Sequence, residues 1–166
     1  ELRQDLGRFW DNFNGFSVGA NATLIDSEVT LPKTESEALA APNLQVDMTE
    51  RDMTNTPEHL YNFFATYDID ETKTRLGLFY TIRGDTLVAG AGQSDGNFIP
   101  SVYETEYGSL NFSLSQKLGE IWTLGFKAKN LLDPEIESVY RYNGTDTTKT
   151  SYTKGMEFSI SLSATF

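Results

Sequence analysis

The sequence predicts an all-β protein, and more closely an antiparallel segment of a transmembrane β-barrel with about six to seven strands. Apolar and polar side chains alternate along most segments, which is the period of an extended strand with two different faces. The connections between these segments alternate between long and short. No stretch approaches the ~20 consecutive apolar residues of a spanning helix, so a membrane assignment must rest on strands.

The alternation is clearest in residues 155–166, GMEFSISLSATF. One side of this extended segment is apolar, with Met156, Phe158, Ile160, Leu162, Ala164 and Phe166, and the other is polar, with Glu157, Ser159, Ser161, Ser163 and Thr165. This pattern is typical of a wall between hydrocarbon and a watery interior. A strand at the edge of a soluble sandwich alternates in the same way, so this segment alone leaves both structures open.

Residues 1–15 predict the end of a strand followed by a short turn or helical turn. Their Trp10 and Phe13, together with Phe16, form an aromatic cluster that fits either a membrane interface or a small aromatic core. Residues 16–24 alternate cleanly and predict a strand. Residues 57–69 predict the strand that returns, although Leu60 and Phe64 break its alternation.

Three further strands are predicted between the returning strand and the last one. Residues 74–88 place Leu76, Leu78, Tyr80 and Ile82 on the outer side and Arg75, Gly77, Thr81 and Arg83 on the inner side, with Phe79 as the exception. Residues 102–118 predict the next strand, whose second half resembles the terminal segment in pattern. Residues 122–130 have Trp122, Leu124, Phe126 and Ala128 outward and Thr123, Gly125, Lys127 and Lys129 inward.

The connections fall into a long set and a short set. The long set comprises an irregular acidic loop at residues 32–56, a flexible Gly-rich loop at residues 90–100 and a loop at residues 140–151; the short set comprises turns at residues 70–73 and 119–120. Outer-membrane barrels have long extracellular loops and short periplasmic turns. Trp122, Tyr67 and Phe166 fall near the short-turn end, where an aromatic girdle is expected.

Composition excludes several classes of function. The net charge is −11, and the chain has no basic stripe, so a nucleic-acid partner is excluded. Between Asp26 and Glu58 there are eight acidic residues against Lys33 and Arg51, which is typical of a solvated loop. The chain has no cysteine and therefore no disulfide framework or thiol chemistry.

Several runs resemble the last strands of TonB-dependent outer-membrane transporters. These runs are residues 99–103 (IPSVY), 110–115 (LNFSLS), 122–126 (WTLGF), 129–134 (KNLLDP) and the strand that ends at Phe166, with residues 17–29 similar to an earlier strand. The run Asn130-Leu131-Leu132-Asp133 is the most specific of them. Two positions depart from the family pattern: Asn111 stands where Asp is more usual, and the residues after Gly155 lack an Arg often found there.

The resemblance implies that residues 1–166 are the C-terminal portion of a barrel of 22 strands. It implies a location in the outer membrane of a Gram-negative bacterium, in contact with outer-membrane lipid. It also implies a plug domain and a segment for an energising inner-membrane TonB-type protein, both upstream of this chain. The barrel-assembly machinery would recognise the terminal strand through Phe158, Ile160, Leu162 and Phe166.

Physical reasoning leads separately to an incomplete barrel. The smallest outer-membrane barrels need 8 strands, more than the number predicted here. An open sheet edge in lipid would leave backbone polar groups without hydrogen bonds. We therefore expect the first and last strands to pair with strands outside this sequence, in the remainder of the barrel.

Two sets of side chains are candidates for binding. Inward cations would meet either an anionic ligand or the acids of a plug domain: Arg75, Arg83, Lys127 and Lys129. Aromatic and Arg side chains toward the outer ends could contact a sugar, a metal chelate or a partner protein: Tyr103, Tyr107, Tyr140, Arg141 and Tyr142.

Catalysis has little support, and we expect no enzyme activity, no cofactor and no metal site. His59 is the only histidine, and we interpret it as an interfacial or loop residue rather than as a zinc ligand. Asp68, Asp70 and Glu71 lack the Gly-containing spacing of a calcium loop and are expected to solvate a turn.

The sequence therefore predicts part of an active transporter that takes up a scarce solute such as a siderophore, vitamin or oligosaccharide. Two alternatives stay open. One is a passive porin-like or structural outer-membrane barrel, which would have no plug. The other is a soluble β-sandwich of a surface or adhesin protein, which would stay in solution without detergent.

Overall fold

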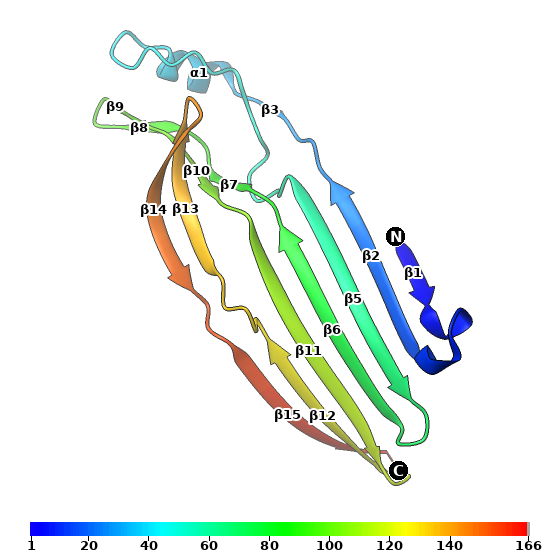
Figure 1. Ribbon diagram of the computed structural model, residues 1–166. Coiled ribbons are helices and arrows are strands. Elements are labelled where there is room, and N and C mark those ends of the chain that lie inside the picture. Colours follow the sequence, from blue (N-terminus) through cyan, green and yellow to red (C-terminus); the bar gives the residue numbers. More distant parts are fainter. Residues whose placement is uncertain (166) are drawn as a thin grey trace.

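The structure is a computed structural model that describes residues 1–165. Its largest element is an antiparallel sheet of seven strands (Figure 1). Their spatial order is their order along the chain: β1 (Leu2–Asp5), β2 (Phe16–Leu24), β5 (His59–Ile69), β6 (Thr74–Arg83), β11 (Tyr107–Leu118), β12 (Trp122–Lys129) and β15 (Glu157–Ala164). The all-β, antiparallel prediction is confirmed. No sheet in the described residues closes on itself.

The strand registers divide the side chains of this sheet into two faces, because paired residues on neighbouring strands point to the same side. One row across the sheet, from β2 to β15, is Val18, Ala65, Leu78, Phe112, Ala128 and Phe158. The row beside it is Ser17, Thr66, Gly77, Ser113, Lys127 and Ser159. We call the side of the first row the apolar face and the side of the second row the polar face.

Charge follows this division completely. Every Asp, Glu, Lys and Arg within the seven strands lies on the polar face: Arg3, Arg75, Arg83, Lys117, Lys127 and Lys129 among the cations, and Asp5, Asp68 and Glu157 among the acids. The polar face is thus net positive in a chain whose net charge is −11.

No second layer covers the apolar face in the described residues. The seven strands lie side by side in a single layer (Figure 1). Phe158, Ile160 and Leu162 on β15 are 58%, 77% and 60% exposed. In the interior strands, Phe63 and Leu78 are also exposed. An exposed apolar surface of this kind is typical of a face that contacts another protein surface or a membrane.

A second sheet continues the long strands at one end of the first. Its order is β14 (Thr145–Thr153), β13 (Glu135–Tyr142), β10 (Ser101–Glu104) and β7 (Thr86–Ala89). The most buried apolar side chains of this outer sheet are Leu87, Ile136, Val139 and Val102, at 1%, 1%, 4% and 5% exposure.

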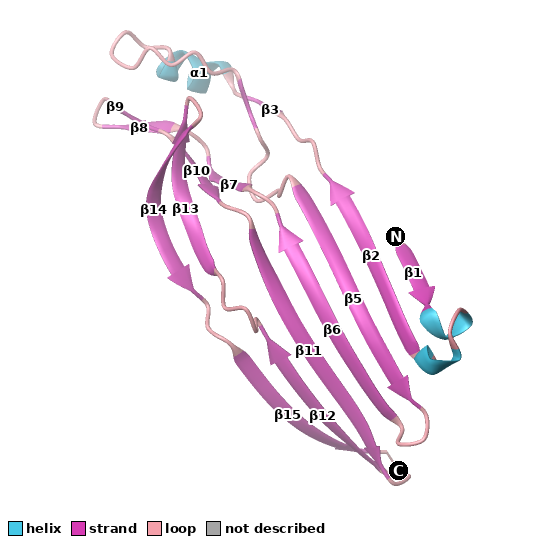
Figure 2. Cartoon of the chain, in the orientation of Figure 1, coloured by secondary structure: helices cyan, strands magenta, loops and turns pink. Residues whose placement is uncertain are grey.

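The outer sheet corrects three sequence predictions. The single strands expected at residues 74–88 and 102–118 are each divided, into β6 and β7 and into β10 and β11 (Figure 2). The loop expected at residues 140–151 is instead the end of β13, a turn and most of β14. Asn143 and Gly144 form this turn with φ of 50° and 72°, the conformation of a tight β-hairpin.

The residues expected to form two long loops also contain regular structure. The segment between β2 and β5 includes β3 (Val29–Thr30), α1 (Lys33–Leu39) and β4 (Glu50–Arg51), and residues 90–100 contain the hairpin of β8 (Gly92–Ser94) and β9 (Asn97–Ile99). Leu31, Leu39 and Val46 form a buried cluster, against which Met48 and Phe98 pack. Together with the outer sheet, these segments form what we call the outer region.

The opposite end of the seven-stranded sheet carries the turns at residues 70–73 and 119–121, which are short as predicted (Figure 1). Between β1 and β2 the chain forms two single helical turns, η1 (Leu6–Arg8) and η2 (Asp11–Phe13). Aromatic rings follow one another here, with centroids 6.0–6.2 Å apart, through Phe9, Trp10, Phe13, Phe16 and Tyr67, and the first three are exposed. The described helices are too short and too polar for any of them to span a membrane.

The Asn130–Asp133 run has a structural role at the break between β12 and β13. Asn130 and Asp133 both have positive φ, 57° and 42°. The Asn130 backbone N–H donates to Asn111 Oδ1 at 3.0 Å, its side-chain amide donates to the Gly155 carbonyl, and the Gly155 N–H donates to Asp133 Oδ1, both at 2.8 Å. The run therefore joins β11, the end of β12 and the start of β15.

Candidate binding surface on the polar face

Hydrogen bonds between side chains cross the centre of the polar face. The Asn62 amide donates to Asn21 Oδ1 on β2 at 2.9 Å, and its Oδ1 accepts from the Thr81 hydroxyl on β6 at 2.7 Å. The groups that form this ladder therefore satisfy one another within the sheet.

Phe64 and Phe79, which break the alternation in the sequence, are directly paired across β5 and β6 on the polar face. A Cβ added at Gly19 would lie 2.2 Å from Phe64 Cζ, and one added at Gly77 would lie 2.7 Å from Phe79 Cε2. Glycine at these two positions therefore lets each ring lie against the backbone. Phe79 remains 40% exposed, although it lies on the polar face.

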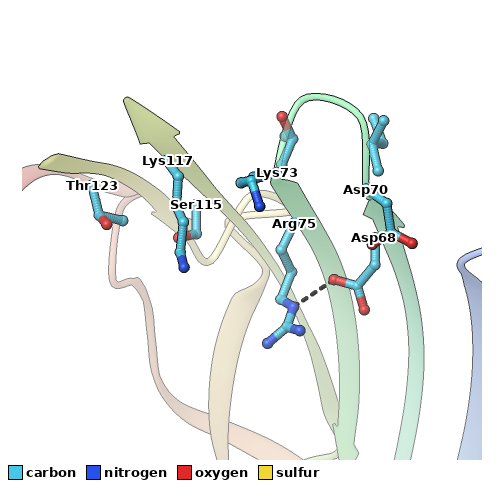
Figure 3. A pocket seen from close by; sticks show the side chains of 9 residues that line it. Asp68, Asp70, Lys73, Arg75, Ser115, Lys117 and Thr123 are labelled. Atoms are coloured by element: carbon cyan, nitrogen blue, oxygen red, sulfur yellow. Dashed lines mark hydrogen bonds and ion pairs between the residues drawn. The ribbon is translucent and has the colours of Figure 1, made fainter. Parts of the chain in front are cut away.

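A basic cluster lies at the short-turn end of the polar face, around a hollow of about 650 Å³ (Figure 3). Its cations are Lys73 in the β5–β6 turn, Arg75 on β6 and Lys117 on β11. Arg75 Nε donates to Asp68 Oδ1 at 2.5 Å across β5 and β6. Among residues 1–165, neither lysine forms an ion pair with a carboxylate, but Asp70 lines the same hollow as Asp68, so the three cations exceed the acids there by only one charge.

The four cations predicted to point inward all lie on the polar face, but they do not converge. Arg75 belongs to the basic cluster at the turn end. Arg83 lies at the outer end of β6, where its Nε donates to Thr86 Oγ1 at 3.2 Å. Lys129 forms an ion pair with Glu157 directly across the β12–β15 ladder, at 2.8 Å, and Lys127 lies between Ser113 and Ser159.

Arg141 and Tyr103, predicted to make external contacts, lie in a cluster inside the outer region. Arg141 donates through Nε and Nη2 to the two carboxylate oxygens of Asp146, both at 2.8 Å, and through Nη2 to Asp85 at 2.7 Å. Its guanidinium lies 4.6 Å from the centre of the Tyr103 ring. The Tyr103 hydroxyl donates to Asp52 at 2.7 Å. These contacts tie residues 52 and 85 to the outer sheet.

The same contacts shift the protonation equilibria of the cluster. Burial, followed by the hydrogen bond to Asp52, raises the pKa of Tyr103. The hydrogen bond to Asp146, against a smaller opposing effect of burial, raises the pKa of Arg141, and that bond lowers the pKa of Asp146. Arg141 and Asp146 are therefore held as a charged pair.

The other three predicted outer residues lie apart from one another. Lys154 Nζ is 5.4 Å from the Tyr107 ring centre, and Lys149 Nζ is 5.3 Å from that of Tyr140. The Tyr142 ring is tilted against Phe98, with centroids 4.9 Å apart. Tyr107 and Lys129, however, line one hollow of about 360 Å³ together with Lys154.

His59 lies at the outer end of β5, in a small polar contact. Its Nε2 is 2.8 Å from Glu106 Oε2, and its ring stacks on Tyr61 with centroids 4.6 Å apart. Within residues 1–165, no group of three His, Asp or Glu side chains is placed to hold a metal ion.

The predicted assembly signal lies on the edge strand β15. Phe158, Ile160 and Leu162 share the apolar face there, opposite Ala128, Phe126 and Leu124 of β12. Phe166 lies outside the described residues.

Comparison with protein-family models, with curated proteins and with solved structures gives no match for this chain.

Proposed function

We propose that this chain forms part of the wall and the external loops of a TonB-dependent transporter barrel in the outer membrane of a Gram-negative bacterium. Its apolar face would contact lipid, and its polar face would line the bore. The outer region would lie outside the cell and the short turns in the periplasm. The barrel would take up a scarce solute when an energised inner-membrane partner acts on a plug domain.

The observation that carries this proposal is that apolar side chains occupy one face of the seven-stranded sheet and all charged side chains occupy the other. An uncovered apolar face with no Asp, Glu, Lys or Arg, backed by a face that holds all of them, suits a sheet between hydrocarbon and water. The series of rings from Phe9 to Tyr67 at the short-turn end, of which Phe9, Trp10 and Phe13 are exposed, fits an interfacial aromatic girdle. A soluble sandwich would need a second layer over the apolar face.

The two edges of the sheet support a larger barrel. β1 pairs with only part of β2, from Ser17 to Ala20, and β15 has a partner on one side only among the described residues. In an antiparallel sheet of seven strands the two edge strands run in the same direction. Closure with antiparallel neighbours therefore needs an odd number of further strands, as a barrel of 22 would supply.

The apolar face does not by itself distinguish an energised transporter from a passive porin. The resemblance of residues 129–134 to the transporter family favours the first. Uptake of the solute in cells lacking the energising inner-membrane protein separates them: the transporter account expects uptake to be abolished, whereas a porin would continue to pass the solute.

The membrane assignment is tested by fractionating cells that express the complete protein. We expect it in the outer-membrane fraction, extractable only with detergent and with a mobility in gels that changes on heating, as for folded barrels. Recovery of the folded protein in solution without detergent would instead support the soluble surface domain.

A further inference from the structure

The seven-stranded sheet and the outer sheet meet where two long strands are interrupted. The break between β6 and β7 covers residues 84–85, and the break between β10 and β11 covers residues 105–106. The strand ends on either side of these breaks are register partners, so the two breaks lie side by side. Together with residues 58–59 at the start of β5, they form what we call the junction.

Hydrogen bonds tie the three segments of the junction to one another. The Gly84 N–H donates to the His59 carbonyl at 2.9 Å, and the Glu58 N–H donates to the Asp85 carbonyl at 3.0 Å. The Glu106 N–H donates to Asp85 Oδ1 at 2.8 Å. The exchange of these three amide protons therefore reports whether the junction is closed.

The imidazole of His59 contacts each segment of the junction. Its Nε2 lies 2.8 Å from Glu106 Oε2, and its ring stacks on Tyr61 of its own strand. A Cβ added at Gly84 would lie 2.5 Å from Nδ1, so glycine at this position lets the ring approach the backbone. Nδ1 has no hydrogen-bond partner among residues 1–165 and can therefore take up a proton.

Carboxylates outnumber cations around this imidazole. The titratable and charged groups on the segments packed against it are Asp26, Glu58, Tyr61, Arg83, Asp85 and Glu106. From the outer sheet, Arg141 contacts Asp85, but it also binds Asp146, and Arg83 donates to a hydroxyl. A positive charge on the imidazole is therefore attracted by its surroundings.

We propose that His59 makes the junction between the two sheets sensitive to the pH of the surroundings. Histidine is the side chain that ordinarily gains a proton between about pH 8 and pH 5. His59 is the only histidine, and the chain has no cysteine. With the added proton its contact with Glu106 becomes an ion pair, which tightens the junction. Without that proton a neutral imidazole donates the hydrogen bond, and the junction opens more often.

A pH-sensitive junction goes beyond the proposed function. Under that function the outer region lies outside the cell, so the junction would link external pH to the position of the outer sheet. The contacts of His59 are the same whether or not the apolar face contacts lipid. Failure of the lipid contact and failure of the pH response are therefore separate outcomes.

Hydrogen exchange of the complete protein in lipid vesicles tests this inference. The amides of Glu58, Gly84 and Glu106 are compared at about pH 8 and about pH 5.5, after correction for the intrinsic exchange rate. We expect protection to be about two- to fivefold greater at the lower pH, a modest effect because water screens the pair at Glu106, whose side chain is 54% exposed. Equal protection at the two pH values would overturn the inference.

Two variants assign the response to the His59–Glu106 pair. His59→Gln can still donate a hydrogen bond to Glu106 but does not titrate, and Glu106→Gln keeps the histidine with a neutral partner. Both should abolish the difference between the two pH values. Glu104→Gln, the same change two residues away at a carboxylate that forms no ion pair with His59, is the matched control and should retain it. A pH difference that persists in both His59→Gln and Glu106→Gln would show that other groups cause it and would also overturn the inference.

Discussion

The outer region and the seven-stranded sheet are built from the same chain but bury their apolar side chains in opposite ways. In the outer region Leu87, Ile136 and Leu39 are enclosed, each at 1% or 2% exposure. In the sheet, Ile160 and Leu162 are exposed although their neighbours are also apolar. The outer region is thus organised as a protein in water is, whereas the sheet leaves its apolar side chains uncovered, as the proposed contact with lipid would require.

The largest difference between the two regions should appear when an enclosed side chain is truncated. Leu87→Ala is expected to destabilise the outer region by about 2 to 5 kcal/mol, because it leaves a cavity. Leu78→Ala on the apolar face should lower the free energy of unfolding less, since under the proposed function lipid would fill the space. Hydrogen exchange of β7, β10 and β13 in the complete protein, in lipid vesicles, measures the first effect. An equal loss of unfolding free energy for Leu87→Ala and Leu78→Ala would contradict this difference between the two regions.

A charge placed on the apolar face of the sheet should destabilise the protein more than the same charge on the polar face. Ile160→Arg should destabilise the folded protein in lipid vesicles by about 2 to 4 kcal/mol, as for a charge facing hydrocarbon near the midplane. Ser161→Arg, one residue along β15 and on the polar face, should change the free energy of unfolding little. In water, an Ile that is 77% exposed should tolerate Arg, so a neutral effect at position 160 would contradict the lipid contact.

Arg141 holds the outer region together through polar rather than apolar contacts. Arg141→Ala removes its hydrogen bonds to Asp85 and Asp146 and is expected to destabilise this region by about 1 to 3 kcal/mol. Faster hydrogen exchange in β13 and β14, with unchanged exchange in β6 and β11, would report this local loss. Arg141→Lys keeps the charge but loses the bidentate contact with Asp146, so it should destabilise this region less than Arg141→Ala does.

The smallest effect is expected from acid. Because the pKa of Asp146 is lowered in the folded state from its ordinary 3.8, its pair with Arg141 stabilises the hairpin above that value and is lost as the pH falls through the folded-state pKa. Exchange of the β13–β14 hairpin should therefore accelerate below about pH 4. Asp146→Asn should remove this pH dependence of exchange in the β13–β14 hairpin. If exchange in the variant still accelerates below about pH 4 as in the wild type, other carboxylates cause the acceleration.

The sheet was largely predictable from the sequence, because a period of two fixes which side chains share a face. The outward set Leu76, Leu78, Tyr80 and Ile82 does share the apolar face, and the inward set of Arg75, Gly77, Thr81 and Arg83 shares the other. The exceptions at Phe64 and Phe79 were visible, but their pairing depends on the register between two strands, which no single segment reveals.

The outer region was predicted less well, and for two physical reasons. In the β13–β14 hairpin, residues 145–153 are exposed on both faces, so no apolar alternation marks the strand; the Asn143-Gly144 pair is the signal that could have found it. In residues 32–56 the order comes from contacts such as Leu39 with Leu31 and Val46, which are distant in sequence or too sparse to show a period.

The two lysines of the basic cluster differ in how far the sequence could place them. Lys117 occupies an inward position of its strand and could have been included among the inward cations. Lys73 lies in a turn, where a period of two gives no direction, and only the fold places it beside Arg75.

The central claim is that one face of the seven-stranded sheet contacts lipid while the other faces water. Spin labels placed one at a time along residues 157–164 of the complete protein, in lipid vesicles, test it through their collisions with oxygen and with a water-soluble nickel reagent. We expect oxygen accessibility to peak at positions 158, 160 and 162 and nickel accessibility to peak at 159, 161 and 163. Low accessibility to both reagents at 158, 160 and 162 would mean that protein covers the apolar face and would contradict the account.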